Sequence, residues 1–332
     1  MRTLLFLSLL VLPCGAGPVP VATPEQGTIR RWITLPSRLE PNQQTVLHAK
    51  VGGYLKSISV DVGDAVKAGQ EIATLEVPEL EADRVKAVAE LDVATADLDR
   101  LQAARVKAPG LVLPQAVDEA EGRQRIAEAT LQRTEVLLGY AKITAPFDGM
   151  ITARHADPGA FIPAGGTTTA GAVVTVCELA VLRDRVPVPE QEAHFIKVGT
   201  LARVIVSPTV PPFEAKVSRH GHNVVAPSAT LAVEVDLPNS DGKLLAGTYV
   251  KTQLAAETHV NARLIPVAAL QVEKASCSVY VVHAGKAVKT KVTAGFIDAQ
   301  HAEILDGLSG AETVAVLTGL SLTDGQAISP AK

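Results

Sequence analysis

The distribution of apolar and polar residues changes character twice along the chain. Over residues 27–78, β-branched residues alternate with polar ones between glycines and prolines, as in TVLHAKVGGYLKSISVDVGDAVKAGQEIATLEV. This alternation predicts short strands joined by tight turns. The same pattern returns after Tyr140 and continues towards the C-terminus, most clearly in LAVEVDL and TYVKTQL. A β-rich body is therefore interrupted once by a segment of a different kind.

The interrupting segment, residues 79–140, has a helical pattern. It lacks Gly and Pro over 79–105, Pro109 and Gly110 then break the pattern, and Pro114 suits the first turn of a second helix. The apolar spacing predicts an antiparallel coiled-coil hairpin, and the alternative is a pair of ordinary amphipathic helices lying on a sheet. The predicted seam consists of Leu80, Ala87, Leu91, Ala94, Leu98 and Leu101 in the first helix, and Val117, Ala120, Gln124, Ala127, Leu131, Thr134 and Leu138 in the second.

Three glycines before the hairpin are repeated after it at the same spacings of ten and six residues. Each glycine is expected to supply a turn with positive φ or a close backbone approach. A strand motif written twice predicts the two interlocking halves of a lipoyl- or biotinyl-like β-sandwich. No lysine stands at a tight turn between the halves, so a carrier function is not expected. The predicted turn glycines are Gly53, Gly63 and Gly69 in the first half, and Gly149, Gly159 and Gly165 in the second.

Length, composition and charge limit the number of domains, the residues of their cores and the kinds of partner. A chain of 332 residues is long enough for two to four small domains. Aromatic residues make up only 3%, so the cores must be built from Val, Leu, Ile and Ala. The formal net charge of −4 offers no basic face for nucleic acid, and no nucleic-acid partner is expected.

The first residues suggest export. Arg2 is followed by an apolar run, LLFLSLLVL, that is too short to span a bilayer as a helix and fits a secretory signal peptide over 1–16. Residues 17–26 are expected to be a flexible leader. Lipid anchoring at Cys14 and an uncleaved anchor remain alternatives, although Pro13 fits a lipidation motif poorly. Further along, Cys177 and Cys277 are expected to be small buried apolar residues, with an inter-domain disulfide as the alternative.

Motifs for chemistry are scarce in the sequence. His220 and His222 stand two apart and would lie on one face of a strand, where half of a metal site is the alternative. No Cys or carboxylate cluster adjoins them in sequence, which favours solvated loop histidines. Met150 is the single Met after the leader, so soft ligands for copper or silver are missing. The sequence contains no HExxH, GxSxG or phosphate-loop motif. We therefore expect no catalytic, cofactor or metal site, and no enzyme activity.

The chain resembles the periplasmic adaptor subunits of RND-type tripartite efflux pumps, in the membrane fusion protein superfamily (HlyD family). The resemblance rests on VGGYLKSISVDVGDAVKAGQEIATLE, ITAPFDGMI, DPGAFI and EILDGLSGAETVAVLTGLSLTDGQAI. It implies a mainly β fold with an inserted α-helical coiled-coil hairpin. The implied domains are a split lipoyl-like sandwich (46–78 with 141–179), the hairpin (79–140), a β-barrel (180–261), and a membrane-proximal β domain (27–45 with 262–332).

The resemblance also implies a role and partners. Such adaptors form hexameric sleeves in the periplasm, associated with the inner membrane. They bridge an inner-membrane RND transporter and an outer-membrane channel for the efflux of small molecules. An adaptor of an ABC-type exporter is the alternative, and an exported enzyme or carrier built on the lipoyl fold is a third hypothesis.

The family implies that the hairpin tip faces the channel, although its tip motif is only partly present here. The Leu expected four residues after Arg100 is Ala104, and the Ser expected at the start of the second helix is Leu113. Leu111–Leu113 capping the hairpin without any partner is the alternative. The expected tip residues are Arg100, Arg105, Lys107, Leu111, Val112, Leu113 and Gln115.

Overall fold

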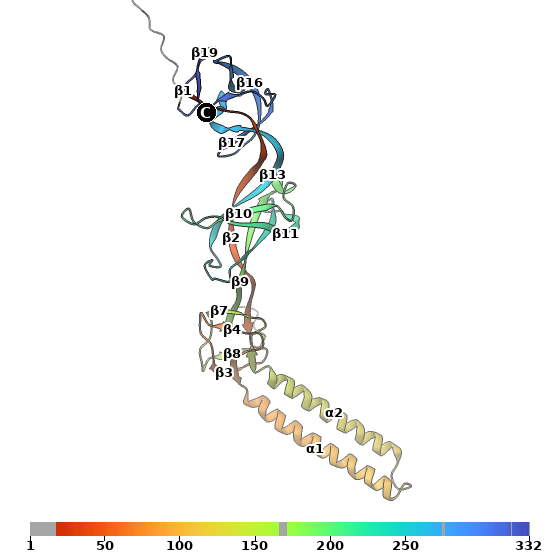
Figure 1. Cartoon of the computed structure of the whole chain (residues 1–332). Helices are drawn as coiled ribbons and strands as arrows, with labels where there is room; N and C mark the ends of the chain where they lie inside the picture. Colours follow the sequence, from red (N-terminus) through yellow and green to blue (C-terminus); the bar gives the residue numbers. More distant parts are fainter. Residues whose placement is uncertain (1–17, 166–170, 274–275, 320, 332) are drawn as a thin grey trace, which may run out of the picture. The chain divides into compact units, whose positions relative to one another are not determined.

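The computed structural model describes residues 18–165, 171–273, 276–319 and 321–331 (Figure 1). The chain divides into two compact units. The hairpin unit comprises Arg38–Asp184 and Asp236–Thr248, and the terminal unit comprises the chain up to Ser37, Arg185–Val235 and Tyr249 onward. Among the described residues, no helix combines the length and apolarity needed to cross a membrane. The expected signal peptide over 1–16, with Cys14, lies outside the described residues.

Two small antiparallel sheets form the β part of the hairpin unit. One has the strand order β6-β5-β3-β8, and in the other β7 pairs with both β4 and β9. Strands β6 and β8 come from the second half of the repeat and pair with β5 and β3 of the first half, while β4 of the first half pairs with β7 of the second, so the halves exchange strands. The strands are β3 (Gly53–Ile58), β4 (Ala65–Val66), β5 (Glu71–Glu76), β6 (Lys142–Thr144), β7 (Gly149–Arg154), β8 (Phe161–Ile162) and β9 (Ala172–Pro189).

Backbone hydrogen bonds between the two halves are reciprocal. Gly63 N–H donates to Ile151 O at 2.8 Å, and Gly159 N–H donates to Leu55 O at 2.8 Å. Likewise, Gly69 N–H donates to Ala145 O at 2.8 Å, and Gly165 N–H donates to Ala49 O at 3.1 Å. Each bond is related to its counterpart by the same offset along the sequence. The repeated glycine spacing thus reflects two halves that form equivalent hydrogen bonds with each other.

The six repeated glycines serve two different purposes. Gly63, Gly69, Gly159 and Gly165 have φ of 95°, 80°, 91° and 65°, the left-handed region that favours glycine. The other two are not turns, because Gly53 begins β3 and Gly149 begins β7. A Cβ on Gly53 would lie 2.7 Å from Glu76 O, and one on Gly149 would lie 2.6 Å from Cys177 O. These two positions need glycine because a neighbouring backbone passes too closely for any side chain.

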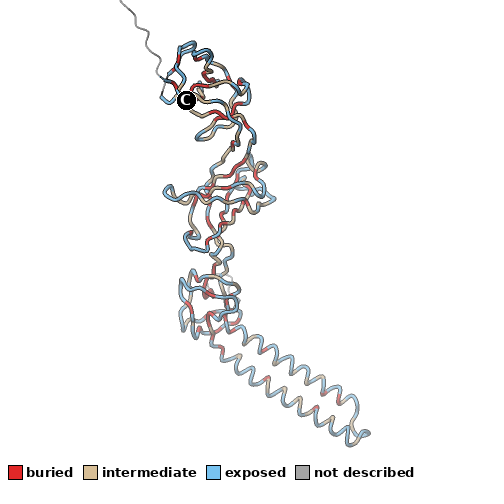
Figure 2. The backbone as a smooth tube through the Cα atoms, in the orientation of Figure 1, coloured by how far each residue is buried: buried red, intermediate tan, exposed pale blue. Residues whose placement is uncertain are grey.

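A single aliphatic core fills the space between these sheets. Leu55 and Ile151, which occupy equivalent places in the repeat, are each 1% exposed. Burying one such side chain contributes roughly 1.5–3 kcal/mol. Leu80 and Leu137, near the base of the hairpin, pack against the same core. Figure 2 shows the buried positions gathered in the β parts, whereas most of the hairpin is exposed.

The terminal unit consists mainly of antiparallel strands. Strand β11 pairs with β12 and β10, β13 pairs with β10 and β17, and β16 pairs with β17 and β15. Strands β2, β9 and β12 each contain a boundary between the two units. The remaining elements are β1 (Pro18–Ala22), β2 (Glu25–His48), α3 (Glu190–Ala193), β10 (Leu201–Ile205), β11 (Phe213–Val225), β12 (Thr230–Pro238), β13 (Tyr249–Pro266), η1 (Val267–Ala269), β14 (Gln271–Glu273), β15 (Ser276–His283), β16 (Lys286–Ile297), β17 (His301–Asp306), β18 (Val314–Ala315), β19 (Gln326–Ala327) and β20 (Ser329–Ala331).

The expectation of a flexible leader over 17–26 is wrong for its described residues. Pro18–Ala22 forms β1, which pairs in parallel with β20 and antiparallel with β18. Val19 is 4% exposed and belongs to a cluster with Tyr280 and Ile328. The Pro- and Val-rich stretch is held by partners roughly 300 residues away in sequence, which local composition does not reveal.

Two buried or half-buried polar clusters tie the terminal unit together. Arg31 donates to Glu192 at 3.1 and 2.8 Å and to Glu257 at 3.2 and 2.9 Å. The hydrogen bond from Arg31 lowers the pKa of Glu192, and the bond to Glu192 raises the pKa of Arg31. Glu303, 5% exposed, accepts from His259 Nδ1 at 2.8 Å and from Phe296 N–H at 3.0 Å. Such pairs connect segments that the sequence separates widely.

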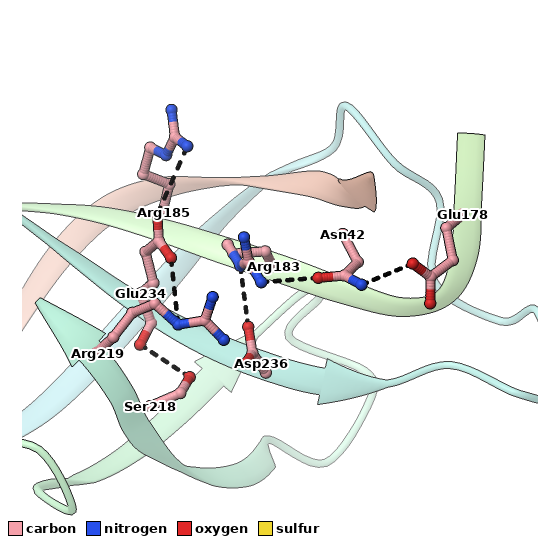
Figure 3. Close-up of polar contacts among 8 residues, drawn as sticks. All are labelled: Asn42, Glu178, Arg183, Arg185, Ser218, Arg219, Glu234 and Asp236. Atoms are coloured by element: carbon pink, nitrogen blue, oxygen red, sulfur yellow. Dashed lines mark hydrogen bonds and ion pairs between the residues drawn. The ribbon is translucent and has the colours of Figure 1, made fainter. Parts of the chain in front are cut away.

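Further polar contacts lie on both sides of the boundary within β9 (Figure 3). In the hairpin unit, Arg183 bonds to Asp236 at 3.1 Å and to Asn42 at 2.7 Å. In the terminal unit, Glu234 pairs with Arg185 at 3.5 Å and with Arg219 at 3.6 Å. Each unit therefore has its own charge-paired cluster next to the boundary.

The close approach at Gly149 generates a prediction. Gly149→Val should destabilise the hairpin unit by more than about 4 kcal/mol, because its Cβ would collide with the Cys177 carbonyl on the neighbouring strand. Gly122→Ala, at a helical position with open space around it, is the control and should stabilise by about 0.5–1 kcal/mol. Urea unfolding of both variants measures the difference, and unchanged stability of Gly149→Val would contradict the packing described above.

Candidate functional site: the helical hairpin and its tip

Two helices form the hairpin, α1 over Pro78–Lys107 and α2 over Pro114–Gly139. Each begins with a proline in its first turn, where the missing N–H costs nothing. Helix α1 has Glu79 and Glu81 in its first turn and basic residues in its last, which complements the helix dipole at both ends. With 30 residues it is about 45 Å long, so the tip lies far from the sandwich core.

The predicted coiled-coil seam is confirmed. Ala87 and Leu98 of α1, and Val117, Ala120 and Thr134 of α2, are buried, and the remaining seam positions are half-buried. Between the helices, Gln124 Nε2 donates to Thr95 Oγ1 at 3.1 Å, and Arg84 pairs with Glu135 at 3.8 Å. The small alanines let the backbones approach closely. The helices therefore bury one narrow stripe and leave the rest of their surface to solvent.

At the tip, the loop between the helices divides its apolar residues between core and surface. Val112 packs against the cluster of Leu98, Val117 and Ala120. Leu111 and Leu113 are instead 86% and 73% exposed. One residue of the loop thus closes the hairpin, and its two neighbours are free to contact another molecule.

The structure brings some of the expected tip residues together and separates others. Arg105 and Lys107 lie in the exposed last turn of α1, next to the loop. Arg100 lies farther back along α1, where it is hydrogen-bonded to Asp97 and donates to Ala96 O. Gln115, the second residue of α2, donates to Glu119 at 2.9 Å. Their role at a channel stays a prediction.

Sequence reasoning missed Val106, which is 81% exposed and lies between the two basic residues of the last turn. The tip surface therefore consists of Arg105, Val106, Lys107, Leu111 and Leu113. The sequence could have indicated Val106, because it is an apolar residue outside the predicted seam positions of the first helix. A surface that combines aliphatic side chains with cations suits packing against helices that present apolar and acidic residues.

A second missed feature is a groove along one face of the hairpin. Val93 of α1 and Ile126 of α2 line it and are 64% and 70% exposed. Ala89, Ala94 and Ala127 also line the groove, and Lys86, Glu90, Asp97, Arg123 and Thr130 complete its lining. Both aliphatic residues lie outside the predicted seam, and apolar residues at such positions could have indicated this surface from the sequence. We call this surface the hairpin groove.

Comparison with known sequences places the hairpin and sandwich among familiar relatives. The family described as "CzcB-like, barrel-sandwich hybrid domain" matches residues 43–169. Multidrug resistance protein MdtA of Escherichia coli (strain SMS-3-5 / SECEC) is 26% identical over 329 aligned residues, which cover 93% of this chain and 78% of MdtA. MdtA of Shigella boydii serotype 18 matches with the same identity and coverage.

Solved structures show the same fold. A MacA-MexA chimera that contains the Pseudomonas aeruginosa MexA α-hairpin domain superposes with a TM-score of 0.71 at 19% identity, covering 88% of this chain and 98% of the chimera. MacA from Actinobacillus actinomycetemcomitans superposes with a TM-score of 0.66 at 18% identity, covering 89% of this chain and 98% of MacA. The mainly β architecture with an inserted helical hairpin is thus a known one.

The buried seam generates a prediction for the hairpin. Ala120→Arg should separate the helices near the tip and destabilise them by about 1–3 kcal/mol, because position 120 is fully buried between Leu98 and Val117. Ala129→Arg, on the exposed side of the same helix, is the matched control and should be nearly neutral. Thermal loss of the helical circular dichroism signal measures both, and equal melting of the two variants would contradict the seam assignment.

Proposed function

We propose, from the premise that this chain is a periplasmic adaptor for efflux of the membrane fusion protein type, that it bridges an inner-membrane RND transporter and an outer-membrane channel. The observation that carries the proposal is the insertion of a long antiparallel hairpin between two interlocked halves of a sandwich. The similarity to the MdtA multidrug resistance proteins extends over nearly the whole chain and supports the efflux role.

The interlocked sandwich explains how one chain acts at two distant places. The hairpin leaves the sandwich between β5 and β6, where a carrier domain would have a short turn. The core anchors both helix bases through Leu80 and Leu137. The tip is then carried about 45 Å away, which suits contact with a channel. Such a protein acts by positioning and sealing, so we infer a structural coupling role without catalysis or a cofactor.

The domain organisation belongs to the same proposal. We assign the lipoyl-like sandwich to 46–78 and 141–179, the hairpin to 79–140, the β-barrel to 180–261, and the membrane-proximal domain to 27–45 and 262–332. The barrel and membrane-proximal domains would face the transporter. Export through a signal peptide over 1–16 would deliver the chain to the periplasm beside the inner membrane, with lipidation of Cys14 as the alternative.

The proposed tip contact uses the exposed part of the loop. Leu111 and Leu113 would pack against channel helices, while Arg105 and Lys107 would contact acidic residues around them. The partial match to the family's tip motif leaves the type of channel open. An adaptor of an ABC-type exporter, the alternative, is not favoured by the similarity to MdtA.

The hairpin groove supports self-assembly into a homo-oligomer, a hexamer by family resemblance. Exposed aliphatic residues on a hairpin side, bordered by Lys86, Glu90 and Arg123, suit lateral packing against the hairpin of a second copy. Side-by-side hairpins would close a conduit, and the tips would form a ring at one end.

Lateral packing predicts a selective effect of charge in the groove. Ile126→Glu should reduce self-association and raise drug susceptibility while the chain stays folded, because a carboxylate would be buried between copies. Val85→Glu introduces the same charge at a residue that is 68% exposed outside the groove, and should leave both properties unchanged. Sedimentation of the purified chains and growth of cells with an efflux substrate give the two readouts. Equal behaviour of the variants would contradict lateral packing through this groove.

Crosslinking in the native host tests the proposed bridging. In a chain with Cys177 and Cys277 changed to Ser, Lys107→Cys reports from the hairpin tip and Lys286→Cys from the start of β16. We expect position 107 to capture an outer-membrane channel and position 286 an RND transporter, each identified by mass spectrometry. Capture of a transporter with ATPase subunits would replace the RND assignment, and capture of neither partner would refute the proposal.

A further inference from the structure

Two histidines lie side by side where strand β11 departs from regular pairing with β12. His220 pairs with Val233 and Val224 pairs with Leu231. Three residues of β11 therefore stand opposite the single residue between those partners. Bulges of this kind redirect side chains and are frequent beside functional sites. The bulge contradicts the expectation of loop histidines, because both side chains belong to a strand.

The two imidazole rings lie at a separation that suits a shared metal ion. The ring centroids of His220 and His222 are 5.1 Å apart, with an interplanar angle of 37°. Imidazole nitrogens bind Zn²⁺ at about 2.0–2.1 Å, so two rings on one tetrahedral ion have centroids about 5.2 Å apart. The observed centroid separation is within about 0.1 Å of this spacing.

The hydrogen bond of His220 favours the tautomer in which Nε2 is available to bind a metal ion. Its Nδ1 lies 2.8 Å from the carbonyl oxygen of Gly221. A carbonyl oxygen only accepts, so Nδ1 carries the hydrogen, and Nε2 of the neutral ring keeps its lone pair. Metal-binding histidines commonly donate their other ring N–H to a backbone carbonyl in this way.

From the bulge, the ring separation and the tautomer, we propose that His220 and His222 form a two-imidazole site for a divalent transition-metal ion of the Ni²⁺, Cu²⁺ or Zn²⁺ class. Imidazole is a suitable ligand for all three. Water completes the coordination, because the part of the chain that the structure describes contains no group of three or more His, Cys, Asp or Glu able to hold an ion.

The cationic side chain next to the site in sequence takes part in an ion-pair cluster. Arg219 precedes His220 in β11 and pairs with Glu234 at 3.6 Å, and Arg185 pairs with the same carboxylate at 3.5 Å (Figure 3). Bound metal would join two positions of β11 across Gly221 and stiffen the bulge. The site is independent of the proposed efflux role, so its failure would leave that proposal intact.

Calorimetric titration of Ni²⁺ into the untagged, full-length mature chain tests the site. We expect one Ni²⁺ per chain and a loss of affinity of more than about tenfold in His222→Ala. His283→Ala removes an exposed histidine of β15 and should bind like the unchanged chain. Absence of binding, or equal binding by the His222→Ala and unchanged chains, would overturn the proposal.

Hydrogen exchange separates a metal site from a general structural effect. Ni²⁺ should slow amide exchange over residues 219–225 in the unchanged chain and in His283→Ala. In His222→Ala the metal should have no effect there, while the melting temperature without metal stays near that of the unchanged chain. Slowing by Ni²⁺ that persists in His222→Ala would place the bound ion elsewhere and refute the assignment.

Discussion

The hairpin unit depends on reciprocal hydrogen bonding between two half-motifs. Gly63 binds the second half through Ile151, and Gly159 binds the first half through Leu55, so neither half has a complete sheet alone. The same arrangement buries Leu55 and Ile151 together in one aliphatic core. Because the halves are held by each other rather than by the segment that joins them, that segment is free to become a long helical hairpin. An adaptor needs this combination of a fixed base and a distant tip.

The hairpin itself balances internal packing against surface available to partners. Its seam buries a single narrow stripe, with alanines at several positions and few large aliphatic residues. This packing holds two helices together and leaves Val93, Ile126 and the tip leucines exposed. Exposed aliphatic residues of this kind cost solubility in a lone protein. Their presence on one long element therefore fits a protein that works in an assembly.

The terminal unit is held by polar contacts over long sequence distances. Glu303 accepts hydrogen bonds from His259 and Phe296, and a Cβ at position 295 would displace its carboxylate from this place. The boundaries between the two compact units fall within β2, β9 and β12 and at the start of β13. The segment predicted as the barrel, 180–261, is therefore divided between the two compact units.

The sequence alone determined the features that repeat locally. Heptad spacing predicted the hairpin and its seam, and the spacing of Gly53, Gly63 and Gly69 predicted a sandwich made of two similar halves. Only the tertiary structure decided how distant segments meet. In that structure β1 pairs with β20, Arg100 lies back from the tip along α1, Val112 packs against the seam, and the rings of His220 and His222 lie side by side at a strand bulge. Local periodicity reflects contacts within a few residues, whereas these outcomes depend on pairing partners and register, which no short stretch of sequence specifies.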